Sequence, residues 1–142
     1  MKKFTETFLL ALIGFALATT VKADTLNITI ADIPDDSGKI MVSVTASEAA
    51  FKGDKPPIMQ FILPARAGEL SFSTDALASG EYGVQVMHDQ NGNEELDANF
   101  VGIPKEPWGF SNDATGNFGP PDWQAVKFTV EGDTTTTIHL NK

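Results

Sequence analysis

Alternation of apolar and polar residues is the pattern that most constrains the fold of this chain. Seven short segments show it, and turn residues such as Gly, Asp, Ser and Pro separate them. Alternate residues of a β-strand lie on the same face, so each segment predicts a strand with one buried face. The predicted strands cover residues 26–30, 40–45, 59–63, 70–72, 82–87, 126–130 and 138–140. We therefore expect an all-β fold, an antiparallel β-sandwich of about seven strands.

The first 23 residues have the features of a secretory signal peptide. Two lysines precede an uninterrupted apolar run at residues 8–18, and Val21 and Ala23 provide the residues expected before a cleavage site. This order predicts cleavage before Asp24 and a periplasmic or extracellular location. The run is shorter than the roughly 20 residues of a membrane-spanning helix, and no later stretch is apolar enough to span a membrane. We expect one domain at residues 24–142.

The predicted domain is strongly acidic. The chain has 10 basic and 19 acidic residues, of which residues 1–23 hold three lysines and one glutamate, which leaves 7 − 18 = −11. Such a surface repels nucleic acid and anionic lipid, so neither is expected as a partner. The chain has no cysteine, which excludes disulfides and thiolate zinc sites. His88 and His139 are too few for a zinc site made of imidazoles.

An acidic segment at residues 88–97 is the main candidate for a functional site. Oxygen-bearing side chains stand at every second position, at Asp89, Asn91, Asn93, Glu95 and Asp97. A loop with this spacing can direct several oxygens to one hard cation, and calcium takes six to eight oxygen ligands. We predict a calcium site made of these five residues, with Glu106 as the nearest closing carboxylate.

A simple hairpin is the alternative for the same segment. The dipeptide Asn91-Gly92 is typical of a tight turn between two strands, and the acidic residues would then form a solvated surface. An EF-hand is a poor description because the flanking segments are predicted strands. Phe100 also stands where an EF-hand has its bidentate glutamate.

Residues 100–124 lack clear periodicity and are rich in Gly, Pro and Asn. Segments of this length within a compact domain are usually functional or disordered, and the aromatic content favours one long ordered loop. We predict that Trp108, Phe110 and Trp123 contribute a surface for a sugar ring or an apolar ligand. The alternative is that the aromatic residues fill the open end of the sandwich and anchor the loop.

Features typical of enzymes are sparse in this chain. It contains no G-x-S-x-G, P-loop, G-x-G-x-x-G or H-E-x-x-H motif. A hydrolase that uses His88 with Asp89, or a carboxylate pair near Glu106, is one alternative. A purely structural accessory domain is another. We expect a non-enzymatic protein with no catalytic residues.

The order of residues 80–119 resembles a family of small secreted bacterial proteins, domain-of-unknown-function family 2141. The pattern G-x-Y-x-x-x-V-x-H-D-x-N-x-N-x-x-L-D continues through Gly102, Pro104 and Glu106 to G-F-S-N at residues 109–112. A looser resemblance covers Gly38 and the segment that follows it. The resemblance implies an exported β-sandwich of the transthyretin-like or Ig-like kind, and it implies no activity.

The acidic segment runs directly into the aromatic segment. A cation bound at residues 89–97 would therefore fix the start of the loop that follows. We expect an exported β-sandwich whose calcium-binding loop orders an aromatic-rich surface loop, and that surface would bind an unidentified ligand or a partner in the envelope or outside the cell.

Overall fold

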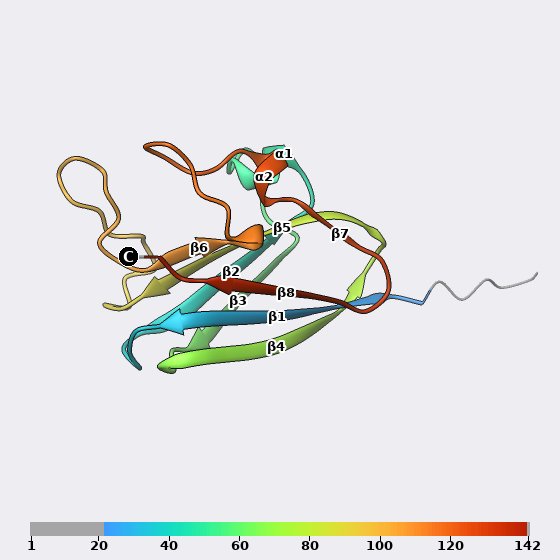
Figure 1. Cartoon of the computed structure of the whole chain (residues 1–142), viewed down its shortest axis with the longest axis horizontal. Coiled ribbons are helices and arrows are strands. Elements are labelled where there is room, and N and C mark those ends of the chain that lie inside the picture. Colours follow the sequence, from blue (N-terminus) through green and yellow to red (C-terminus); the bar gives the residue numbers. More distant parts are fainter. Residues whose placement is uncertain (1–21, 142) are drawn as a thin grey trace, which may run out of the picture.

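A computed structural model describes residues 22–141, so nearly all of the predicted signal peptide lies outside the described residues. The elements follow in the order shown in Figure 1. They are β1 (Asp24–Ile33), β2 (Lys39–Thr45), α1 (Glu48–Phe51), β3 (Met59–Pro64), β4 (Gly68–Leu77), β5 (Gly80–Asp89), β6 (Trp108–Phe110), the 3-10 turn η1 (Ser111–Asp113), α2 (Trp123–Val126), β7 (Phe128–Val130) and β8 (Thr134–His139). The all-β prediction is confirmed.

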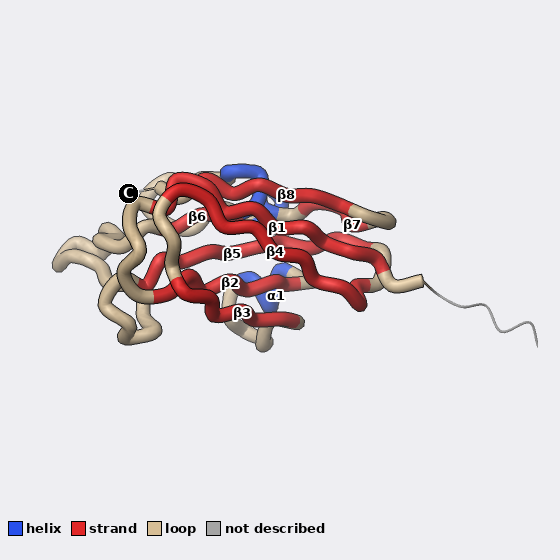
Figure 2. Tube along the Cα trace, turned by 90° about the horizontal axis from the view of Figure 1, so that it is seen from below, coloured by secondary structure: helices blue, strands red, loops and turns tan. Residues whose placement is uncertain are grey.

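The strands form two sheets that pack face to face, as Figure 2 shows. One sheet has the order β4-β1-β8, and the other has the order β3-β2-β5-β6, with β7 paired to part of β5. The predicted sandwich is therefore confirmed. Its strands are antiparallel except for one pair, because β8 runs parallel to β1, with Ile30 opposite Ile138. The last strand of the chain thus lies beside the first.

Most predicted strands are present, with two local differences. β6 was not predicted, and Val126 belongs to α2 where a strand was expected. The helical turn α1 begins after Ser47, whose hydroxyl accepts the backbone N–H of Ala50 over 3.2 Å. A serine at this position satisfies an N–H that has no partner within the helix. None of the helices in residues 22–141 has the length and apolar character needed to cross a membrane.

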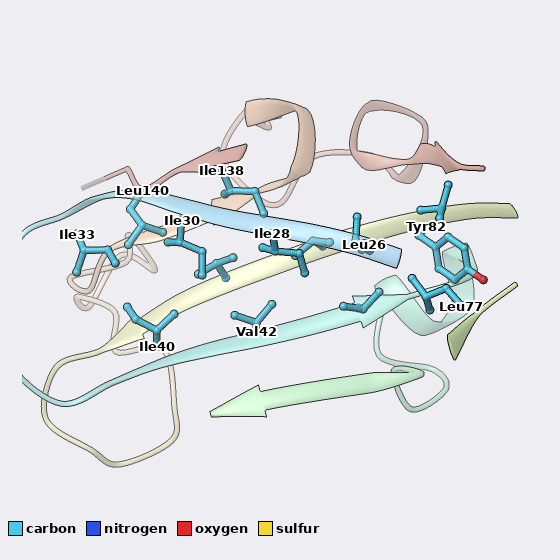
Figure 3. Close-up of a cluster of buried hydrophobic side chains, with 14 of the residues drawn as sticks. Leu26, Ile28, Ile30, Ile33, Ile40, Val42, Leu77, Tyr82, Ile138 and Leu140 are labelled. Atoms are coloured by element: carbon cyan, nitrogen blue, oxygen red, sulfur yellow. The ribbon is translucent and has the colours of Figure 1, made fainter. Parts of the chain in front are cut away.

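The main core lies between the two sheets. The inward positions of β1 and β2 are fully buried apolar residues, as the alternation predicted, and Figure 3 shows those that it labels on the two strands facing one another. They are Leu26, Ile28, Ile30, Ile40, Val42 and Val44. Truncation of one such isoleucine or leucine to alanine typically costs about 2–5 kcal/mol of stability. The same core includes Val84 and Val86 of β5, so it holds in place the strand from which the candidate site projects.

A second, smaller core covers part of the outward face of the larger sheet. It contains Phe51 of α1 and Trp123 and Val126 of α2, with Phe110 packed against it. The rings of Phe51 and Trp123 have centroids 5.9 Å apart. Gly83 on β5 makes room for this cluster, because a Cβ there would lie 2.7 Å from Trp123 Cζ3. The cluster anchors the second half of the long loop.

Candidate functional site

Residues 90–107 connect β5 to β6 and project from one end of the sandwich, at the left of Figure 1. Because β5 and β6 are neighbours in one sheet, both ends of this loop start from the same rigid edge. The loop holds every residue of the predicted calcium site except Asp89, which ends β5. The structure therefore brings the predicted residues into one place.

Asp89 is fully buried and organises the turn that follows it. Its Oδ1 accepts the backbone N–H groups of Gly92 and Asn93 over 2.8 and 3.1 Å, and its Oδ2 accepts that of Glu94 over 2.8 Å. Three such bonds compensate for taking the carboxylate out of water. Gly92 and Glu94 have φ angles of 77° and 64°, so the chain bends tightly around the carboxylate.

Glu106 joins the two ends of the loop. The side chain is 5 % exposed, with Oε1 accepting the backbone N–H of Gln90 over 2.9 Å and Oε2 that of Asp97 over 3.1 Å. The predicted closing carboxylate thus reaches the loop, where it binds backbone groups. One glutamate holds the start and the middle of the loop at a fixed separation.

The alternating asparagines form turns with their own backbone. Asn91 Oδ1 accepts the N–H of Asn93, and Asn93 Oδ1 accepts that of Glu95, each over 3.0 Å. The side-chain amide of Asn93 donates to Asp97 Oδ1 over 3.1 Å, and that of Asn91 donates to Asp97 Oδ2. An Asx oxygen commonly accepts the N–H two residues further along, so the every-second-residue spacing has a structural use without a cation.

These bonds change which oxygens are available to calcium. Within residues 22–141, no group of three or more His, Asp or Glu side chains is placed to hold a metal ion. Asp89 and Glu106 are buried and accept backbone N–H groups, whereas Asn91, Asn93, Glu95 and Asp97 are exposed or partly exposed. The oxygens of Asn91, Asn93 and Asp97 would have to exchange hydrogen bonds within the loop for a cation. Calcium binding by this loop stays a prediction.

The base of the loop packs against the turn between β1 and β2. Gln90 Nε2 donates to Asp35 Oδ2 over 2.8 Å, and Lys39 Nζ lies 3.3 Å from Glu94 Oε1. Hydrogen bonds from the Ser37 side chain and backbone lower the pKa of Asp35. Gly38 touches Asp89, because a Cβ on Gly38 would lie 1.9 Å from the Asp89 carbonyl oxygen. The close approach requires glycine there.

The side chains of His88 and Asp89 point to opposite faces of β5. Successive residues of a strand point to opposite faces, so His88 faces the interior while Asp89 faces the loop. The His88 side chain is fully buried, with Nε2 2.7 Å from the carbonyl oxygen of Ser37. In residues 22–141 its Nδ1 has no hydrogen-bond partner. His88, Asp89 and Glu106 are thus each held by hydrogen bonds within the fold, and the hydrolase alternative stays a hypothesis.

The tip of the loop is an ordered apolar hairpin formed by residues 98–104. Ala98 and Pro104 form a β-bridge, and Asn99 Oδ1 accepts the backbone N–H groups of Val101 and Ile103, each over 3.0 Å. The side chains at this tip face solvent: Phe100 is 100 % exposed, Val101 61 % and Ile103 60 %. A contiguous exposed apolar cluster on a folded protein is typical of a binding surface.

The three predicted ligand-surface aromatics have different environments. Trp123 is buried in the small core on the outward face of the larger sheet, where it anchors the loop to that face and not to the open end of the sandwich. Trp108 and Phe110 are partly exposed on the outward face of β6, with ring centroids 5.5 Å apart. The aromatic segment therefore has an anchoring part and a part that borders solvent.

An apolar row crosses the outward face of the larger sheet, and the sequence reading missed it. Residues directly opposite in neighbouring strands lie on the same face. The pairs Ile62–Met41, Met41–Met87 and Met87–Trp108 therefore place four apolar side chains in line across β3, β2, β5 and β6. The sequence did indicate this row, because Met41 and Met87 stand at outward positions where the alternation would place polar residues.

The turn η1 fixes the middle of the long loop, and this role was also missed. Ser111 is buried, accepting the N–H of Val84 over 2.9 Å and donating to the carbonyl of Val126 over 2.7 Å. Asn112 Nδ2 lies 3.0 to 3.1 Å from the carbonyls of Ala125, Val126 and Lys127. These two side chains tie β5, α2 and the loop together.

Comparison with protein families identifies the group to which the chain belongs. Residues 28–139 match the model of a family described as "Uncharacterized protein conserved in bacteria (DUF2141)". This range runs from β1 to the end of β8 and includes the whole acidic loop and its apolar tip. Neither the curated proteins nor the solved structures gave a match to the chain. Since the family model covers most of the chain and confirms the resemblance seen in its motifs, the protein is a member of the DUF2141 family.

Proposed function

We propose that this protein is an exported, non-enzymatic binding module that contacts a partner in the cell envelope or outside the cell. Its contact would be made by the apolar tip of residues 98–104. The observation that carries this proposal is the full exposure of Phe100 on a hydrogen-bonded hairpin. Exposed apolar side chains lower solubility, and they gain free energy only when another surface covers them.

The base of the loop supports the tip as a binding element. Asp89 and Glu106 are buried and together accept five backbone N–H bonds, so the hairpin projects from a braced platform. A loop fixed before binding loses less conformational entropy when it binds. The bracing therefore favours tight contact through few residues.

The charges around the tip indicate the kind of partner. Glu94, Glu95 and Asp97 lie in the same loop with one basic residue, Lys105, and the whole chain has a net charge of −9. Such a surface is repelled by nucleic acid and by anionic lipid. The partner that fits is a protein with an apolar site bordered by neutral or basic side chains.

Export is supported by the composition of the first 23 residues. A basic start, an apolar run and small residues before Asp24 are the parts of a cleavable signal peptide. N-terminal sequencing of the protein recovered outside the cytoplasm tests this part. A chain that starts at Asp24 supports export, and an uncleaved chain in the cytoplasm contradicts it.

The binding role is tested by placing a photo-crosslinking amino acid at position 100 in the full chain in its native cells. The matched control is position 118, because Phe118 is equally exposed on a different loop. The expected result is one discrete crosslinked species from position 100, lost when Val101 and Ile103 are both changed to serine. Crosslinks of equal yield from positions 100 and 118, or none from either, would contradict the proposal.

A further inference from the structure

β3 forms an open edge of the larger sheet. It pairs with β2 on one side, and among the strands of residues 22–141 no second one pairs with it. It borders the lower layer in Figure 2. The open edge of a strand presents backbone N–H and C=O groups that can take up another strand.

The β3 edge lacks charges and bulges, two of the features that commonly prevent strand pairing, and its one protective residue is Pro64 at its end. Its sequence, MQFILP, carries no charge, and its six pairs with β2 run in continuous register. β4, at the edge of the other sheet, differs in both respects. It exposes Glu69 and Asp75, and its register with β1 shifts twice. Charges and bulges protect an edge, so β4 is protected and β3 is open.

Apolar surface is available on both faces of β3. On the inward face, Met59, Phe61 and Leu63 are only partly buried. On the outward face, Ile62 is 52 % exposed and is the last member of the apolar row that begins at Trp108. An added strand with apolar side chains at its inward positions would cover the first three residues, and a side chain with a methyl group, such as threonine, at an outward position would contact Ile62.

Basic and acidic residues both lie around β3, since Asp54 adjoins Lys55 and Asp36 accepts the backbone N–H of Ala67, the residue after Arg66. Of the seven basic residues after residue 23, four lie close to it in the chain or in the sheet: Lys39, Lys52, Lys55 and Arg66. Lys39 and Lys52 form ion pairs with Glu94 and Glu48. In the described part of the chain, Lys55 before β3 and Arg66 after it have no carboxylate within ion-pair distance. A peptide with carboxylates near its ends would complement these two charges.

We propose that the open edge of β3 takes up an extended peptide segment of another protein, with alternating apolar side chains and carboxylates near both ends. A second copy of this chain fits less well. Antiparallel pairing of two β3 strands would bring Lys55 of one copy towards Arg66 of the other, and the acidic bodies of the two copies repel each other. The site uses none of residues 98–104, so it is independent of the binding function proposed above.

The test measures the fluorescence anisotropy of a labelled synthetic peptide as the purified protein is added to it. In this peptide valine and threonine alternate, and a pair of glutamates stands at each end. The first control peptide has lysines in place of the glutamates. The second is N-methylated at alternate residues, which removes the N–H groups that strand pairing needs. The expected result is saturable binding that is about fivefold weaker for the lysine peptide and absent for the methylated one. Hydrogen exchange should slow in β3 and stay unchanged in β4.

Two sets of variants locate the site on β3. Ile62→Lys should weaken binding at least about tenfold by adding a charge to the edge and removing an apolar contact. Thr137→Lys on β8 is the matched control, since it adds the same charge at an exposed position of the other sheet and should leave binding unchanged. Changing Lys55 and Arg66 together to glutamate should reverse the preference between the acidic and basic peptides.

Three results would overturn this proposal. One is the absence of saturable binding at millimolar peptide. Another is equal binding of the N-methylated peptide, which would show that backbone pairing is not involved. The third is a dimer in sedimentation velocity that Ile62→Lys dissociates, which would make a second copy the occupant of the edge.

Discussion

Asp113 and His139 join the 3-10 turn η1 to the last strand by two hydrogen bonds. His139 Nδ1 lies 2.8 Å from Asp113 Oδ2, and the backbone N–H of His139 donates to Asp113 Oδ1 over 2.8 Å. Asp113 has a φ of 48°, a conformation that aspartate adopts more readily than most residues. The pair therefore holds the turn η1 of the long loop against β8, 26 residues later in the chain.

Stability should depend on pH through this pair. Burial opposes ionisation of Asp113, but its hydrogen bonds with His139 outweigh burial and lower the pKa of Asp113 below 3.8. The hydrogen bond and charge of Asp113 raise the pKa of His139 above 6.5. The contribution of His139 to the free energy of unfolding is complete below pH 6.5 and is lost as pH rises through the raised pKa. The aspartate contribution is complete above pH 3.8 and is lost as pH falls through the lowered pKa.

The contribution of the pair is therefore largest between pH 3.8 and 6.5. Both side chains are about half exposed, so His139→Ala should lower the melting temperature in this window by only roughly 1–3 °C. The difference from the unaltered protein should shrink at pH 9. Thr137→Ala, at an exposed position of the same strand, is the control. A difference of constant size from pH 5 to pH 9 would show that the charge on His139 is irrelevant.

Replacing Asp89 should destabilise the loop base even without any metal. Asp89→Ala leaves the N–H groups of Gly92 and Glu94 without an acceptor and the N–H of Asn93 with Asn91 Oδ1 alone, and leaving a buried polar group unpaired costs about 1–3 kcal/mol. We expect a loss of roughly 2–4 kcal/mol in urea unfolding measured in chelator. Glu95→Ala, an exposed acid of the same loop, should change stability by less than about 0.5 kcal/mol. Equal effects of the two substitutions would contradict the structural role of Asp89.

Calcium binding can be measured separately from that structural role. If Asn91, Asn93, Glu95 and Asp97 bind calcium, a hundredfold excess over the dissociation constant stabilises the fold by about 2.7 kcal/mol. The melting temperature should then rise by roughly ten degrees in calcium but not in magnesium. Asp97→Asn should reduce the rise while Asp75→Asn, on β4, should not. No rise in calcium would exclude a functional site of this kind in the loop.

Ser111→Ala should cost more stability than its size suggests. The hydroxyl links the N–H of Val84 to the carbonyl of Val126, and all three groups are buried. Its loss should reduce the free energy of unfolding by about 1–3 kcal/mol. It should also release α2, so the intensity and wavelength of Trp123 fluorescence should change before global unfolding. Thr115→Ala, an exposed position nearby, is the comparison, and similar behaviour of both variants would contradict the linking role.

The fold was predictable in strands where every second residue is apolar and buried between the sheets. In β2 and β5 the inward residues Val42 and Val86 are buried, so alternation is visible in the sequence. It fails for β6, where the inward residue is Gly109. A Cβ there would lie 2.8 Å from Ile138 Cγ2, so this strand cannot show an inward apolar residue. The parallel pairing of β8 with β1 leaves no local signal, because it joins segments far apart in the chain.

The candidate site was predictable in place but not in chemistry. The spacing of Asp89, Asn91 and Asn93 indicated a loop organised by oxygen atoms, and the structure shows such a loop. The same spacing suits a cation or the backbone N–H groups two residues further along. Burial of Asp89 decides how its oxygens are used, and burial depends on how the turn at Gly38 packs against it. That packing is a tertiary contact without a sequence signature.

The parallel pairing of β1 with β8 has a consequence for when the domain can fold. β1 is the central strand of its sheet, and one of its two neighbours is formed by the last residues of the chain. A chain that emerges N-terminus first from a ribosome or a translocation channel cannot complete this sheet until residues 134–139 have emerged. Contacts between such distant segments also form slowly. The three-stranded sheet should therefore stay incomplete until nearly all of the domain has emerged, and β1 and β4 are without their third strand until then.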